Sequence, residues 1–148
     1  MREQFIHIDE YGHKHYYSDR KMRIFHREDG PAIECANGGT EWYINGKRHR
    51  EDGPAIEYAN GSKSWYINDK LHREDGPAVV YADGYKSWYI NGKLHREDGP
   101  AIDDVDGYKA WYLNDKHLTE EEFNTRMNPV TELTLQEYLD CREVWSER

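Results

Sequence analysis

The residues best suited to chemistry are four histidines, each followed by an arginine and two carboxylates. The heptapeptide HREDGPA begins at His26, His49, His72 and His95, at intervals of 23 residues. Histidine beside carboxylates is the equipment of general acid–base catalysis. An active site is needed once, however, whereas this motif occurs four times without variation. We therefore interpret it as part of a structural repeat, in which Arg pairs with an acid and Gly-Pro breaks the strand, and we expect no catalytic residue.

The same histidines are badly spaced for a metal site. Equivalent side chains of neighbouring hairpins lie about 10 Å apart, whereas ligands of one ion lie within about 4 Å of each other. His7, His13 and His15 fall in an irregular first unit and follow no ligand pattern. The acidic run 103–107 resembles only a fragment of a calcium loop, and edge protection or a salt link to the tail explains it more simply. We expect no metal and no cofactor.

A row of tyrosines is the better candidate for binding. Tyr43, Tyr66, Tyr89 and Tyr112 occupy one position of successive units, and we expect them on the outer face beside small residues such as Ala55. Tyrosine is favoured at interfaces for its large, stiff and amphipathic contact. Ordinary half-buried packing is the alternative explanation. The spacing of about 10 Å also leaves room between rings for one planar group, such as a nucleotide base.

Specificity should lie where the units differ, or on a face that stacking leaves free, because invariant positions serve the repeat. A variable position beside the tyrosine row reads Glu34, Glu57, Val80 and Asp103. The predicted binding residues are therefore Tyr43, Tyr66, Tyr89, Tyr112, Glu34, Glu57, Asp103, Glu120, Glu121 and Glu122.

Each unit contains a hairpin that should position these side chains. The dipeptides Asn37-Gly38, Asn60-Gly61 and Asp83-Gly84 suit a two-residue type I′ turn. In that register Ile56 faces Trp65, because paired residues share a face. The predicted core face carries Ile56, Tyr58, Trp65 and Ile67, and the other face carries Ala55, Glu57, Ala59, Ser64 and Tyr66. Trp42, Trp65, Trp88 and Trp111 should share one buried face.

The unit resembles the MORN repeat, which has the same length and is also a hairpin. The matching residues are Trp42, Gly46, Lys47, His49 and Gly61, and the resemblance covers roughly residues 5–117. The chain departs from that repeat where His-Gly-x-Gly is replaced by His-Arg-Glu-Asp-Gly-Pro, and it is similar to divergent members in phage and giant-virus proteins. The resemblance implies an open, curved antiparallel sheet that contacts proteins or lies near lipids, and it implies no chemistry.

These patterns predict one mainly β domain over residues 1–148, an elongated single-layer antiparallel sheet with a helical cap. Residues 4–25 form a degenerate first hairpin, 26–117 form four repeats, and 118–148 form an acidic helical cap. Capping boxes begin two tail helices, at Thr119 with Glu122 and at Thr134 with Glu137, and the first helix should extend through Met127. The tail should cover the last unit; the alternative is that its acidic face docks a partner.

Charge narrows the choice of partner. The net charge is −9 over 148 residues, which argues against binding nucleic acid through phosphates and against docking on anionic lipid. We expect a cytoplasmic protein, in the host cytoplasm if the chain is viral. Its two cysteines form no disulfide framework, and the sequence shows no apolar leader and no membrane span.

We therefore expect a non-enzymatic scaffold that binds a protein partner with a basic surface, such as a host defence component that it inhibits. A homodimer through the first edge strand is a further possibility. The alternatives are a sponge for a small nucleotide-like ligand and, third, an enzyme.

Overall fold

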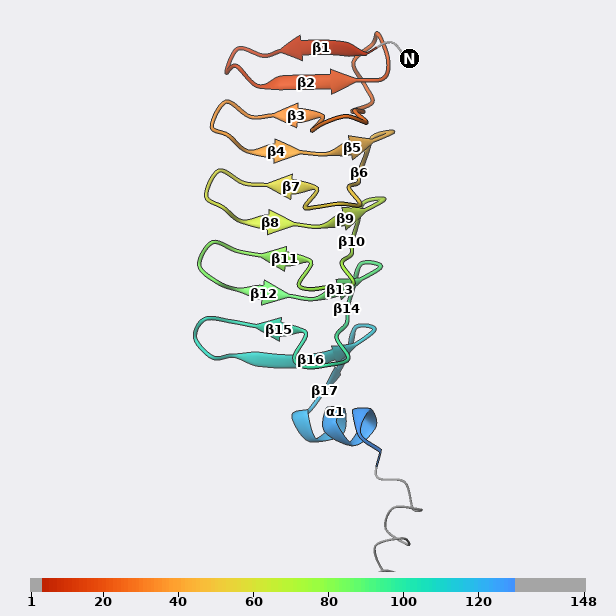
Figure 1. Ribbon diagram of the computed structural model, residues 1–148, viewed down its shortest axis with the longest axis vertical. Helices are drawn as coiled ribbons and strands as arrows, with labels where there is room; N and C mark the ends of the chain where they lie inside the picture. The colour runs from red at the N-terminus through yellow and green to blue at the C-terminus, as the bar shows by residue number, and fades with distance from the viewer. Residues whose placement is uncertain (1–3, 130–148) are drawn as a thin grey trace, which may run out of the picture.

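The computed structural model describes residues 4–129 and shows one long sheet of stacked hairpins followed by a short helix (Figure 1). The elements are β1 Phe5–Ile8, β2 Lys14–Tyr17, β3 Ile33–Glu34, β4 Thr40–Glu41, β5 Tyr43–Ile44, β6 Lys47–Arg48, β7 Ile56–Glu57, β8 Lys63–Ser64, β9 Tyr66–Ile67, β10 Lys70–Leu71, β11 Val79–Val80, β12 Lys86–Ser87, β13 Tyr89–Ile90, β14 Lys93–Leu94, β15 Ile102–Asp103, β16 Lys109–Leu113, β17 Lys116–Leu118 and α1 Glu120–Met127.

The main sheet has eleven strands in the order β1-β2-β3-β4-β7-β8-β11-β12-β15-β16-β17. Three small hairpins, β5–β6, β9–β10 and β13–β14, branch from it. In Figure 1 the first turn of each unit lies on the left of the stack and the second turn lies on the right. The predicted fold class, an open antiparallel sheet of repeated hairpins with a C-terminal helix, is confirmed.

The first turn of each unit is a three-residue loop. The Tyr58 N–H donates to the Ser62 carbonyl and the Gly61 N–H donates to the Tyr58 carbonyl, both at 2.9 Å. Gly61 has a left-handed φ of 88°, while the Asn60 side-chain oxygen accepts the Ser62 N–H at 3.0 Å. These bonds define a type I turn followed by a bulge. The predicted type I′ turn at this dipeptide is therefore wrong.

The longer loop moves the strand register by one residue. Ile56 pairs with Ser64 and Glu57 pairs with Lys63, so Ile56 and Trp65 lie on opposite faces, since side chains alternate along a strand. The predicted core face is wrong for this reason. Tyr58 is 51% exposed rather than buried, and Tyr66 lies on the side of Ile56 and Ser64 rather than with Glu57.

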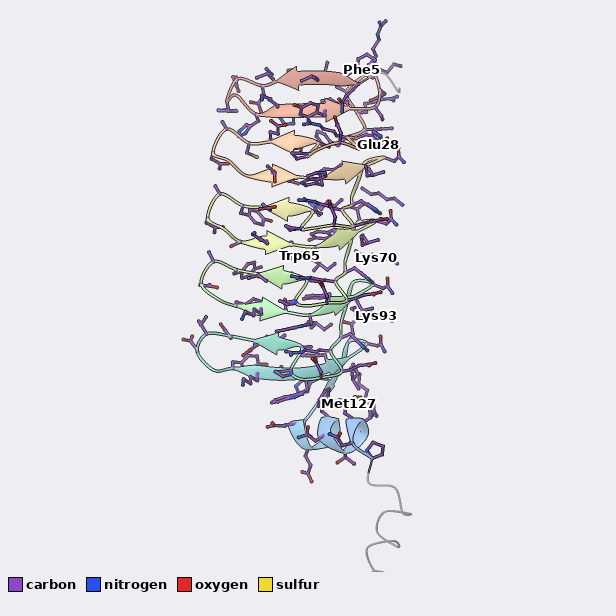
Figure 2. The ribbon with its side chains drawn as sticks, viewed as in Figure 1. Phe5, Glu28, Trp65, Lys70, Lys93 and Met127 are labelled. Atoms are coloured by element: carbon purple, nitrogen blue, oxygen red, sulfur yellow. The ribbon has the colours of Figure 1, made fainter. Side chains whose placement is uncertain are left out.

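We call the two sides of the sheet the Trp face and the Tyr face. The Trp face carries Trp42, Trp65, Trp88 and Trp111, all half-buried, with Tyr16 in the equivalent place of the first hairpin. Figure 2 shows the side chains along the stack, with Trp65 labelled. The Tyr face carries Tyr43, Tyr66, Tyr89 and Tyr112. Strand β16 shows the alternation without interruption, because Ala110, which pairs with Ile102, and Tyr112 flank Trp111. The common face expected for the tryptophans is confirmed, although they are half-buried.

Small and branched side chains form the core beneath both faces. On the Tyr face the central column contains five buried side chains, Ile56, Ser64, Val79, Ser87 and Ala110. On the Trp face Ala32, Ala55, Ala78 and Ala101 are buried, as is Tyr16 in the first hairpin. The alanine expected beside the tyrosine row, Ala55, therefore belongs to the opposite face.

The type I′ geometry occurs at the second turn. Asn68 and Asp69 both have left-handed φ, 50° and 64°, and Ile67 pairs with Lys70 across them. The Asp69 N–H donates to the Arg48 carbonyl at 2.9 Å, and the Asp69 carboxylate accepts the Arg48 N–H at 2.9 Å. Each second turn thus bonds to the unit before it.

The two ends of the array differ. At the C-terminal end, Thr119 and Glu122 form the predicted capping box, and α1 ends at Met127 as expected. Phe123 and Leu118 are buried there. At the other end, β1 is an edge strand with exposed Ile6 and Ile8. The second predicted capping box lies outside the described residues, and no helix within residues 4–129 is long and apolar enough to cross a membrane.

Candidate functional site

The HREDGPA segment packs on the Trp face, where its arginine covers the aromatic ring. The Arg50 guanidinium carbon lies 4.0 Å from the centroid of the Trp42 ring. Its Nε donates to Asp52 at 2.9 Å and its Nη1 donates to the Pro54 carbonyl at 3.2 Å. A β-carbon on Gly53 would lie 2.8 Å from the guanidinium carbon, so a side chain there would displace the stacked arginine.

The same arrangement recurs in every unit. Arg27 stacks on Tyr16 at 4.0 Å, Arg73 on Trp65 at 4.1 Å and Arg96 on Trp88 at 4.0 Å. The equivalence of Tyr16 with the tryptophans supports the interpretation of the first hairpin as a degenerate unit.

The histidine of each motif bonds to the next unit. His72 Nδ1 accepts the Asn91 N–H at 3.1 Å, and His95 Nδ1 accepts the Asn114 N–H at 3.2 Å. His72 Nε2 faces Glu74 at 3.7 Å. Since Nδ1 is already an acceptor for the scaffold, this nitrogen is not free to take a proton from a substrate.

Grooves separate successive HREDGPA segments on the Trp face. One of about 720 Å³ has Trp88 and Ile90 among its lining residues, and its counterpart of about 690 Å³ has Trp65 and Ile67. They are built from the same residue types, so they belong to the repeat and carry no feature that distinguishes one unit from another.

The predicted acidic binding residues on the strands lie on the Trp face, away from the tyrosine row. Glu34 accepts from Arg27 at 2.7 Å, from Lys14 at 3.3 Å and from Tyr16 at 3.1 Å. The hydrogen bond from Arg27 holds the pKa of Glu34 below its ordinary value. Glu57 lies 3.7 Å from Lys63, and Asp103 pairs with Lys109 across the strands. The observed register differs from the predicted one by one residue, and these acids therefore lie on the face opposite the tyrosine row.

The tyrosine row is half-buried and its rings have partners within the chain. Tyr43 packs against Phe25 with ring centroids 5.3 Å apart, and Tyr112 against His117 at 5.0 Å. Arg48 lies 5.3 Å from the Tyr66 ring centroid. Burial raises the pKa of Tyr43, Tyr66 and Tyr89. These rings pack along the Tyr face beside Ser64 and Ser87.

Three tyrosines that are more exposed than this row flank the first turns of the repeats. Tyr58, Tyr81 and Tyr108 are 51%, 48% and 59% exposed, and each lies one residue beyond a strand position of the Trp face, hence on the Tyr face. We did not predict these residues, because the two-residue turn placed Tyr58 in the core. The variation between units was the available signal: the position of Tyr58 reads Cys35, Tyr58, Tyr81 and Asp104 along the array.

Of the three predicted acids of the tail, one caps the helix and two are exposed without a capping role. Glu122 accepts the Thr119 N–H at 2.8 Å, and this bond lowers the Glu122 pKa. Glu120 and Glu121 are exposed in the first helical turn.

In the first hairpin His13 and His15 have ring centroids 6.3 Å apart, but no group of three His, Cys, Asp or Glu within residues 4–129 is placed to hold a metal ion.

Fold and site define a β-hairpin repeat protein with a Trp face built around the repeated HREDGPA segment and a Tyr face whose first-turn residues differ between units. No protein-family model matches the chain, and no curated protein matches it.

Proposed function

We propose that the protein is a non-enzymatic scaffold that binds a protein partner through its Tyr face. The observation that carries the proposal is the set of exposed rings Tyr58, Tyr81 and Tyr108 on the face that also bears the half-buried row. Stiff aromatic groups around small buried residues offer contact area at little entropic cost. On the opposite face the HREDGPA segments contact the tryptophans, and the grooves between those segments are lined by the same residue types in both units.

Charge and resemblance indicate the kind of partner. A net charge of −9 favours a basic surface, because complementary charge speeds association. The similarity of the unit to MORN repeats supports protein contact as the activity. Because the unit also resembles divergent repeats of phage and giant-virus proteins, a host defence component is the first target to examine.

The proposal is tested by capture with matched variants. Immobilised wild-type protein, the Tyr58→Ala, Tyr81→Ala double variant and a Glu51→Gln, Glu74→Gln double variant are exposed to extract of the cell that makes or meets the protein. Glu51 and Glu74 are exposed carboxylates of the Trp side. A partner retained by the wild type and the glutamine variant, but lost from the alanine variant, supports the Tyr face. Equal retention by all three contradicts it.

A further inference from the structure

We propose that the gap between Tyr58 and Tyr81 binds a planar cation, the guanidinium group of an arginine on the partner. This inference deepens the proposed function and rests on it, since the gap would be one subsite of the Tyr face. It is lined by Tyr58, Asn60, Ser62, Tyr81, Ala82 and Asp83, and its volume is about 300 Å³.

The position of the gap follows from strand order. Tyr58 leaves β7, Ser62 precedes β8 and Tyr81 leaves β11, and these three strands are neighbours in the sheet. Two strand spacings therefore separate the two tyrosines, about 10 Å. Ser62 lies between them and is 5% exposed, and its hydroxyl oxygen accepts the Ala82 N–H at 3.0 Å. The small, fixed serine leaves the space between the rings open.

The next unit closes the equivalent space. Where the gap has Ser62, the following unit has Tyr85, whose ring stacks on Tyr81 with centroids 5.3 Å apart and an interplanar angle of 26°. The same stack braces Tyr81 as one wall of the gap. In the array the combination of two first-turn tyrosines with a small residue between them occurs once, because the other first-turn positions read Cys35 and Asp104.

The lining selects a cation. Asp83 accepts the Tyr85 N–H through Oδ1 at 3.0 Å, which fixes a carboxylate at the rim of the gap. A guanidinium group stacks on an aromatic ring while donating hydrogen bonds to a carboxylate. No lysine or arginine lines the gap, so a phosphate group would meet a carboxylate without a counter-charge. An arginine side chain is therefore favoured over a nucleotide.

The subsite is tested on the isolated protein, without the partner. N-acetyl-arginine amide, N-acetyl-citrulline amide and AMP are titrated at millimolar concentration while backbone amide shifts are followed by NMR. Citrulline keeps the planar shape of arginine and removes its charge. We expect saturable shifts at Ser62, Ala82 and Asp83 with the arginine probe, and binding about fivefold weaker or more with citrulline.

Three variants locate the effect. Asp83→Asn keeps the turn, because Asn60 makes the same bond in the preceding unit, and it should weaken arginine binding by about threefold to fivefold. Ser62→Tyr reproduces the next unit and should abolish the shifts by filling the gap. Tyr11→Ala removes an exposed tyrosine of the first hairpin that does not line the gap, and binding should be unchanged.

Equal affinity for arginine and citrulline, tighter binding of AMP, or arginine shifts that survive Ser62→Tyr would overturn the subsite. These failures are distinct from failure of the proposed function. If the captured partner still requires Tyr58 and Tyr81 while the arginine probe does not bind, the Tyr face stands and the cation subsite is wrong. If the probe binds but no partner depends on those rings, the proposed function is wrong.

Discussion

The Trp face and the Tyr face are made from the same strands, yet they behave differently along the array. On the Trp face each HREDGPA segment repeats the same stack, with an arginine 4.0 or 4.1 Å from the ring of the preceding hairpin, although the strand position of Glu57 changes from unit to unit. On the Tyr face the first-turn residues change from unit to unit, from Cys35 and Gly39 to Asp104 and Tyr108. Identical residues thus mark what stacking needs, and the exposed residues that change at the first turns of the Tyr face are the ones we propose for recognition.

The largest difference between the faces should be in stability. Trp65→Ala removes a half-buried ring together with the stack of Arg73, and we expect it to lower the free energy of unfolding by about 3 kcal/mol. Tyr58→Ala removes an exposed ring and should change it by less than about 0.5 kcal/mol. Urea unfolding followed by tyrosine and tryptophan fluorescence measures both. A Tyr58→Ala variant as unstable as Trp65→Ala would contradict the division into scaffold and free face.

A smaller effect should appear in acid. The hydrogen bonds from Arg50, Arg73 and Arg96 hold the pKa values of Asp52, Asp75 and Asp98 below the ordinary value of 3.8. A depressed folded-state pKa adds stability above the unfolded-state value, and that stability is lost as the pH falls through the folded-state value. Unfolding free energy should therefore fall as the pH is lowered below about 4.

Asp75→Asn should make that acid-dependent loss shallower, and Glu74→Gln is its matched control for the change in charge. Urea unfolding at a series of pH values compares the three proteins. An unchanged pH slope in Asp75→Asn would show that the Arg73–Asp75 contact does not contribute to the scaffold.

The smallest expected effect concerns β1, which is an edge strand and pairs only with β2 within residues 4–129. Ile6 pairs with Tyr16 and Ile8 with Lys14, so both isoleucines lie on the Trp face, and they are 56% and 60% exposed. An uncovered edge strand is a template for pairing with a second copy. We predict weak self-association of the wild type in sedimentation analysis and a monomer for Ile6→Lys with Ile8→Lys. A wild type that stays monomeric at high concentration excludes this homodimer.

The sequence predicted the repeat, the antiparallel sheet of hairpins and the first helix because each rests on local signals, the 23-residue period for the first two and the capping box for the helix. It misassigned the first turn because Asn-Gly occurs in both turns of the unit and suits either geometry. In Asn60-Gly61 the asparagine side chain caps the loop and only the glycine takes left-handed φ. Cross-strand charge favoured the observed register, since the three-residue loop places Glu57 opposite Lys63, a favourable pair.

The same error in the first turn affected the predicted binding residues. The period of 23 residues identified the tyrosine row. The predicted register, however, was wrong by one residue, and it placed Glu34 and Glu57 on the same face as the tyrosines. In the structure these two acids pair with Arg27 and Lys63 on the Trp face. The exposed Tyr58 and the serine beside it could not be recognised while Tyr58 was assigned to the core. Tertiary geometry, not residue type, decides which of the twelve tyrosines are available to a partner.

The most direct test of the central claim is the affinity of the captured partner for the folded Tyr58→Ala, Tyr81→Ala double variant, measured by calorimetry beside the Glu51→Gln, Glu74→Gln variant. Truncation at a hot spot costs about 2 kcal/mol or more, which is roughly thirtyfold in Kd. We predict at least that loss for the alanine variant, with little change in its unfolding free energy, and nearly wild-type affinity for the glutamine variant. Unchanged affinity in the alanine variant, or a comparable loss in the glutamine variant, would contradict the assignment of binding to the Tyr face.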